Sequence, residues 1–167
     1  HQTGTERCNE VAQRLNVKCD VIINIQGDEP FINPIQINEL IKLFRNPSVQ
    51  IGTLAKKIKE LETIEDENTP KAIFDEEGNS LNFCRKIQNF STNETYYKHV
   101  GIYGYRKDIL KKICQLQPSK NEIKENLEQL RWLDNNYKIK IGITKFHTIS
   151  IDTTEDIKKI KAQSKIK

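Results

Sequence analysis

The sequence contains no methionine at any of its 167 positions, and it begins with His1. Because a natural reading frame starts with methionine, we expect this chain to be a fragment or a processed product. No apolar run approaches the roughly 18 residues that a membrane-spanning helix needs. No signal peptide opens the chain either. These absences predict a protein that does not span or bind a membrane.

Side chains that bind metals or form disulfides are few and isolated. They are Cys8, Cys19, Cys84 and Cys114, together with His1, His99 and His147. None of them lie within the spacing of a metal-ligand pair, so a zinc site is not expected. Without a secretory signal, reduced thiols and a cytoplasmic location are the expectation.

Neither sign of charge dominates the composition. The 27 basic and 23 acidic residues give a net charge of +4, and the lysines are scattered. This pattern favours a solvated surface over a nucleic-acid patch, although a modest positive field would also suit small anionic substrates. A chain of 167 residues with 36% hydrophobic side chains fits a single domain, 1–167, with a sizeable core.

Strand-like and helix-like segments alternate along the chain. We expect helices at 5–15, 33–44, 109–116 and 123–133, strands at 21–26, 49–58, 99–105 and 137–143, a loop or short helix at 60–70, a hairpin at 71–84, and a strand, turn and helix at 149–160. Such alternation predicts an α/β fold with a mostly parallel sheet and helices on both faces. The central hairpin predicts an antiparallel excursion from that sheet.

Several helix starts carry capping signals. Asn33 precedes Pro34, and Ser119 with Glu122, like Thr153 with Asp156, is typical of a capping box. Asp108 is expected to cap the helix that follows it. A buried stripe is expected on the second helix, formed by Ile37, Leu40, Ile41 and Phe44.

Two aspartates follow apolar strands. Asp28 lies after the carboxyl end of the strand "VIINIQ" in "VIINIQGDEPFI", and Asp152 follows the apolar strand end in "ISIDTTED". Ligands of open α/β sheets bind outside the carboxyl ends of the strands. Each aspartate alone could simply cap the next helix or sit in a turn. Together they predict a site of hard oxygen ligands suited to Mg²⁺, which keeps water and substrate phosphates as its other ligands.

Six segments occur in an order that resembles one enzyme family. They are "HQTGTERCNEV", "VIINIQGDEPFI", "KAIFDEEGNSLNFCR", "YKHVGIYGYR", "LEQLRWL" and "ISIDTTEDIKKI". They are similar to the 3-deoxy-manno-octulosonate (Kdo) cytidylyltransferases, or CMP-Kdo synthetases, over essentially the whole chain. The resemblance implies a Rossmann-like nucleotidyltransferase domain whose antiparallel excursion serves dimerisation. It also implies transfer of CMP from CTP to the anomeric hydroxyl of Kdo, with release of pyrophosphate, in lipopolysaccharide biosynthesis. Family members are cytoplasmic, Mg²⁺-dependent homodimers.

The resemblance also implies residue roles. Asp28 and Asp152 match the catalytic metal ligands, and Thr3 and Gly4 match a Ser-Gly near the cytosine. Arg85 matches an arginine that binds the sugar carboxylate, for which a guanidinium fork is suited. Sugar contacts are implied for Gln26, His99, Tyr103, Glu128 and Gln129. On residues alone, Arg85 could be a rim ion-pair partner and His99 an ordinary core or surface histidine.

Departures from the family keep alternatives open. Cys84 stands where the family has serine, and "KIQNF" after Arg85 lacks the usual prolines. The family's N-terminal phosphate loop is not represented, so this chain alone is expected to be inactive. A related sugar-acid cytidylyltransferase, such as an acylneuraminate type, is one alternative. A non-catalytic sugar-binding or dimerisation module is another, because one fold hosts many functions.

Overall fold

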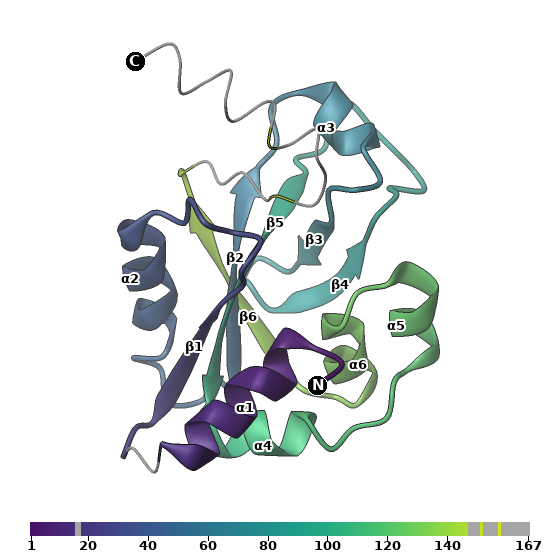
Figure 1. Cartoon of the computed structure of the whole chain (residues 1–167). Helices are drawn as coiled ribbons and strands as arrows, with labels where there is room; N and C mark the ends of the chain where they lie inside the picture. Colours follow the sequence, from purple (N-terminus) through teal and green to yellow (C-terminus); the bar gives the residue numbers. More distant parts are fainter. Residues whose placement is uncertain (16–17, 147–150, 152–156, 158–167) are drawn as a thin grey trace.

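A ten-residue strand, β5 (Tyr97–Arg106), runs through the middle of a six-stranded sheet. The structure is a computed structural model that describes residues 1–15, 18–146, 151 and 157. Its other elements are α1 (Gly4–Arg14), β1 (Val21–Ile25), α2 (Pro34–Leu43), β2 (Ile51–Lys57), α3 (Leu61–Glu65), β3 (Lys71–Phe74), β4 (Ser80–Cys84), α4 (Lys107–Ile113), α5 (Lys120–Glu125), α6 (Gln129–Asp134) and β6 (Ile139–Thr144). Figure 1 shows β5 beside β1, β2 and the β3–β4 hairpin.

The α/β class, the helices on both faces and the hairpin are confirmed. Strand directions differ from the expected mostly parallel sheet, because β2 and β6 form the one parallel pairing among the described strands. The strands β1, β2 and β6 do point the same way, as strand–helix alternation predicts. However, β5 runs in the opposite direction between β1 and β2, so both of those contacts are antiparallel. Hydrophobic pattern alone does not say which strands are neighbours.

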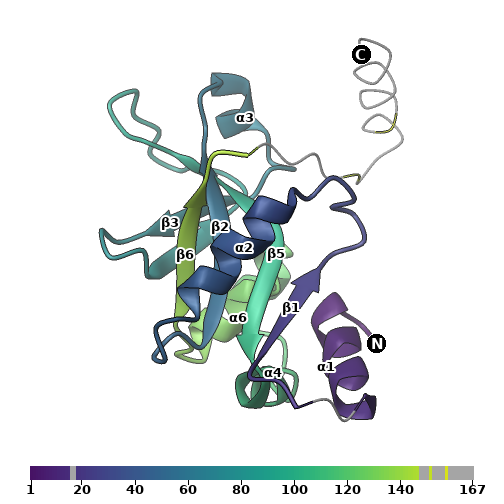
Figure 2. The same cartoon turned by 90° about the vertical axis from the view of Figure 1, so that its left-hand side faces the viewer.

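Each face of the sheet has its own core. The helix α2 covers one face, where Leu40 and Phe44 pack against Leu54 and Ile102. The helices α4 and α6 cover the other face (Figure 2), where Trp132 packs in a larger cluster. That second face also buries Tyr103 and Tyr105 of β5, together with His99. The predicted site residues of β5 therefore lie under α6.

The α2 stripe is only partly as predicted. Leu40 and Phe44 are buried, but Ile41 is 47% exposed and Gln36 is fully buried in its place. The Gln36 amide oxygen accepts a hydrogen bond from the Asn33 backbone N–H at 3.0 Å, which completes the capping box, while its Nε2 has no hydrogen-bond partner among the described residues. A polar residue with a satisfied cap thus occupies a position that periodicity assigns to a hydrophobic residue.

Of the other predicted caps, the Ser119–Glu122 box is confirmed. The Asp108 cap is wrong: Arg106 holds the N-cap position without a side-chain bond, and Asp108 lies in the first turn, where it pairs with Lys112. The strand β5 ends at Arg106 and α4 begins at Lys107, so the last strand residue is also the N-cap of the helix. The Thr153–Asp156 box lies outside the described residues.

The hairpin turn also agrees with the sequence. The hairpin turns at Gly78, whose φ of +80° favours glycine, and a Cβ there would lie 2.9 Å from the Ile141 carbonyl oxygen. No helix in the described part of the chain is long and apolar enough to cross a membrane.

Candidate functional site

The end of β1 places Asp28 beside a distant part of the chain. The backbone N–H of Ile151 donates to the Asp28 carbonyl oxygen at 2.8 Å. Asp152, the next residue, lies outside the described residues, so the meeting of the two carboxylates stays a prediction. The Asp28 Oδ1 atom is buried and has no hydrogen-bond partner within the described ranges. A buried carboxylate oxygen without a donor is suited to a ligand that supplies positive charge.

The neighbouring Glu29 has a different role. It is 4% exposed, and its Oε1 accepts a hydrogen bond from the Gly101 backbone N–H at 3.3 Å. A Cβ at Gly101 would lie 3.0 Å from that oxygen, so this close approach favours glycine. Gln26 is half-buried at the turn, and its carbonyl accepts from the Glu29 backbone at 3.1 Å. Glu29 thus anchors the turn to β5, while Asp28 is available for ligand chemistry.

His99 and Tyr103 lie side by side on β5. Their ring centroids are 5.2 Å apart, and Tyr103 also packs edge-on against Trp132 at 5.2 Å. The His99 Nε2 atom lies 3.0 Å from the Thr53 hydroxyl, and burial lowers the pKa of His99 to about 3. The Tyr103 hydroxyl is buried and has no partner among the residues described. The structure therefore brings these two predicted sugar contacts together.

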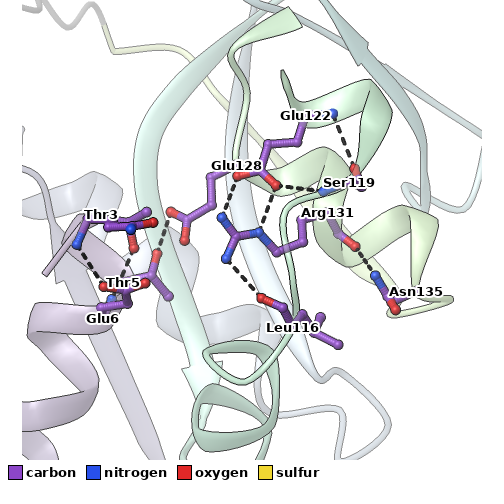
Figure 3. A network of polar contacts seen from close by, with 10 residues as sticks. Thr3, Thr5, Glu6, Leu116, Ser119, Glu122, Glu128, Arg131 and Asn135 are labelled. Atoms are coloured by element: carbon purple, nitrogen blue, oxygen red, sulfur yellow. Dashed lines mark hydrogen bonds and ion pairs between the residues drawn. The ribbon is translucent and has the colours of Figure 1, made fainter. Parts of the chain in front are cut away.

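The N-terminus of α1 meets the start of α6 (Figure 3). Thr3 caps α1, and its Oγ1 accepts from the Glu6 backbone N–H at 3.2 Å. Two residues later, the buried Thr5 donates its hydroxyl to Glu128 Oε2 at 2.7 Å. The predicted nucleotide segment, Thr3 and Gly4, is thereby joined to a predicted sugar residue, Glu128.

Burial raises the pKa of the Glu128 carboxyl group. Hydrogen bonds from Thr5 and Thr3, and the nearby charge of Arg131, act in the opposite direction. Gln129, the first residue of α6, is 5% exposed. The predicted core positions on either side of the pair, Leu127 and Leu130, are confirmed.

A second carboxylate holds α5 against α6. Arg131 donates from Nε to Glu122 Oε2 at 2.7 Å and from Nη2 to Glu122 Oε1 at 2.6 Å, while Nη1 donates to the Leu116 carbonyl at 3.2 Å. The bidentate pair is buried, and Ser119 adds its backbone N–H to Glu122 at 3.1 Å. This pair fixes the segment that presents Glu128 to Thr5.

Arg85 makes contacts that its sequence did not predict. It follows β4, and its guanidinium donates to the carbonyls of Glu125 at 2.7 Å, Glu67 at 3.1 Å and Asn126 at 3.2 Å. Arg85 therefore ties the end of β4 to the C-terminus of α5, where a cation is favoured by the helix dipole. A cavity of about 530 Å³ is lined by residues of the β3–β4 hairpin. Its lining includes the sequence neighbours of Arg85, Cys84 and Lys86, and its hydrogen-bond partner Glu125.

Three site-forming residues were missed by the sequence analysis: Thr5, Asn24 and Thr53. All three are at least 96% buried, and Asn24 lies opposite Tyr103 in the β1–β5 register. A signal was present for Asn24 and Thr53, because each is a polar residue inside an otherwise apolar strand segment; Thr5 lies in a polar segment and gave none. In the part of the chain that the structure describes, no three His, Cys, Asp or Glu side chains form a group that could hold a metal.

Comparison with known proteins gives the family. The cytidylyltransferase family profile matches residues 1–141. The 3-deoxy-manno-octulosonate cytidylyltransferase of Bacteroides thetaiotaomicron is 45% identical over 170 residues, which cover 95% of this chain and 68% of the relative. That of Cytophaga hutchinsonii is 44% identical, covering 96% and 68%.

Solved structures agree with the sequence relatives. A CMP:2-keto-3-deoxy-manno-octonic acid synthetase in complex with CTP superposes with a TM-score of 0.88 at 34% identity, over 99% of this chain and 69% of that one. A 4-diphosphocytidyl-2C-methyl-D-erythritol synthase from Anaerococcus prevotii, with a TM-score of 0.59 at 16% identity, covers 99% and 68% and shares the fold alone. The sequence motifs, the sheet and these matches together establish that the chain belongs to the cytidylyltransferase family.

Proposed function

We propose that the chain acts as a nucleotidyltransferase that joins CMP, taken from CTP, to the anomeric hydroxyl of Kdo and releases pyrophosphate. The observation that carries the proposal is the 34%-identical match to a synthetase in complex with CTP, at a TM-score of 0.88. The named activity of the curated relatives supports the same substrate pair. The product would serve lipopolysaccharide biosynthesis.

The proposed roles follow the geometry. Thr3 and Gly4 would lie along the cytosine, and Glu128, one hydrogen bond away through Thr5, would bind a sugar hydroxyl. His99, Tyr103 and Gln129 would line the same sugar pocket, with Gln26 at the end of β1. Three of the five N–H groups of Arg85 donate to carbonyl oxygens. The other two would donate to the sugar carboxylate.

Asp28 and Asp152 are the residues that would hold Mg²⁺. The buried Asp28 Oδ1, which has no hydrogen-bond donor among the residues that the structure describes, fits this role, as does the contact between Asp28 and Ile151. When bound there, the ion would supply positive charge to the phosphates of CTP. Asp28 itself would hold its carboxylate in a fixed position, because Glu29 anchors the turn that carries it.

We also propose a homodimer in the cytoplasm. The β3–β4 hairpin leaves Ile73 and Leu81 exposed by 40% and 63%, which suits a subunit interface. The four cysteines are all free, which suits a reducing compartment.

The test is pyrophosphate release in the full-length form, meaning this chain extended to the length of its curated relatives. We expect turnover with CTP, Kdo and Mg²⁺, and much less with N-acetylneuraminate in place of Kdo. Preference for N-acetylneuraminate would favour the acylneuraminate type. Binding of Kdo without turnover would favour a non-catalytic module. The 167 residues span 68% of the length of the Bacteroides relative, and we expect no turnover from them alone, because positioning the α-phosphate needs donors around the outer phosphates.

A further inference from the structure

A buried hydroxyl fills the irregularity at the centre of the sheet. The β2–β5 register passes from Thr53 opposite Tyr103 to Leu54 opposite Val100, so β5 has two more residues than β2 at this point. The Thr53 side chain is fully buried there. Its Oγ1 atom lies 2.8 Å from the Ile102 carbonyl oxygen, 3.3 Å from the Val100 carbonyl oxygen and 3.0 Å from His99 Nε2.

The number of protons on these atoms fixes their roles. A threonine hydroxyl has one proton to donate, and a carbonyl oxygen can only accept. The Thr53 proton therefore goes to a carbonyl, and the shorter contact is with Ile102. If Thr53 donated to His99 instead, its oxygen would face a carbonyl oxygen at 2.8 Å with no proton between them. His99 must accordingly donate from Nε2 to Thr53.

This assignment leaves one nitrogen of His99 to act as an acceptor. In a neutral imidazole with the proton on Nε2, the Nδ1 atom carries a lone pair. Burial keeps the ring neutral by lowering its pKa to about 3. Within the described residues no group hydrogen-bonds His99 Nδ1. The adjacent Tyr103 hydroxyl likewise lacks a partner there, and it is a donor.

We propose that Thr53 is a positioning residue: it locks His99 in the Nε2–H tautomer, so that His99 Nδ1 and the Tyr103 hydroxyl form an acceptor–donor pair for one hydroxyl group of the ligand. A sugar hydroxyl is suited to this pair because it can accept from Tyr103 and donate to His99 at once. The tautomer stands on the contacts of Thr53 alone. The identity of the hydroxyl as part of Kdo rests on the proposed function.

The tautomer is tested by NMR on the ¹⁵N-labelled 167-residue chain. Long-range ¹H–¹⁵N spectra distinguish protonated from unprotonated ring nitrogens, and the His99 signals are those that His99→Gln removes. We expect a protonated Nε2 and an unprotonated Nδ1 between pH 6 and pH 8. The opposite assignment, with the proton on Nδ1, would overturn the proposal, and this arm needs no variant of Thr53.

Variants then test the part played by Thr53. Thr53→Val removes the hydroxyl and should give a mixture of tautomers, whereas Thr53→Ser should keep the wild-type spectrum. Thr144→Val is the matched control, because Thr144 is 2% exposed on the neighbouring strand and its hydroxyl oxygen accepts from the Phe146 backbone. An unchanged His99 spectrum in Thr53→Val would contradict the positioning role.

Kinetics of the full-length form test the link to the ligand. Thr53→Val should raise the KM for Kdo about three- to tenfold, the scale of one neutral hydrogen bond, with the KM for CTP unchanged and near-wild-type values restored in Thr53→Ser. An equal rise in both KM values, or none, would refute the role in sugar binding even if the tautomer is as expected. Absence of turnover in the wild type would instead refute the proposed function and leave the spectroscopic result to decide the tautomer.

Discussion

The buried Glu122–Arg131 pair predicts a large loss of stability when one partner is removed. Arg131→Met keeps an unbranched apolar stem but removes the donors at 2.7 Å and 2.6 Å to Glu122 and at 3.2 Å to the Leu116 carbonyl. The side chains of Arg131 and Glu122 are only 6% and 12% exposed. In the variant, the Glu122 carboxylate would be left buried with its charge uncompensated.

The expected cost follows from that charge. Removing one partner of a buried pair costs about 3–5 kcal/mol of unfolding free energy, chiefly because the other charge stays buried. A domain of this size loses roughly 2–4 °C of Tm per kcal/mol, so a fall in Tm of about 6–20 °C is expected. The double variant Glu122→Leu with Arg131→Met should recover much of the loss, because no charge then stays buried.

Urea denaturation followed by tryptophan fluorescence measures this effect directly. Trp132 is the sole tryptophan of the chain, is 1% exposed and follows Arg131 in α6. The control is Lys112→Met, which breaks a 3.3 Å pair with Asp108 whose side chains are 59% and 68% exposed. It should cost less than about 0.5 kcal/mol. If Arg131→Met costs no more than Lys112→Met, the buried pair does not stabilise α5 against α6.

Three further predictions concern the site. In the full-length form, Asp28→Asn and Asp152→Asn should each lower kcat, through a loss of roughly 3–4 kcal/mol of transition-state stabilisation. The urea midpoint of Asp28→Asn should match that of the wild type. A variant that keeps more than about a tenth of wild-type activity would show that its aspartate is not an essential ligand. Arg85→Lys should raise the KM for Kdo, by about 1.5–3 kcal/mol in free energy, and leave the KM for CTP unchanged; unchanged kinetics with lower stability would mean that Arg85 serves only to hold α5. Because the pKa of His99 falls from 6.5 to about 3 on folding, the stability that its neutral form contributes is complete above pH 6.5 and is lost as pH falls towards 3. Urea unfolding should therefore show about 2–3 kcal/mol lost between pH 7 and pH 4.5, and His99→Gln should remove that part of the acid dependence.

The element order could be predicted from the sequence, but the neighbours in the sheet could not. Alternation of apolar segments located β1, α2, β2 and the β3–β4 hairpin within a few residues. The ten residues of β5 were predicted too short at both ends, because Tyr97, Lys98 and Arg106 do not look like core strand residues. The length of β5 is set by its pairing with three other strands. A local sequence pattern does not contain that information.

Part of the candidate site could be predicted from the sequence, where the residue type and its position together indicate a chemical role. Asp28 could be singled out from its position at a strand end. Glu128 and Gln129 were implied by the family resemblance, and their place between two core leucines agrees with it. The alternative roles of Arg85 could not be resolved, since its carbonyl partners come from two other segments of the chain. Thr53 gave the weakest signal, because a buried threonine in a strand is ordinary until its hydroxyl is seen opposite two carbonyls and a histidine.

The position of a residue in the fold decides which tests of function can be interpreted. Asp28 lies in a turn after β1, so its replacement changes charge without removing a core contact. His99 and Tyr103 are 8% and 3% exposed, and their rings pack within the second core under α6. Replacing either residue alters packing as well as hydrogen bonding, so a loss of activity there would not by itself identify a ligand contact. A change of proton position, as at Thr53 and His99, separates the two effects because packing alone does not produce it.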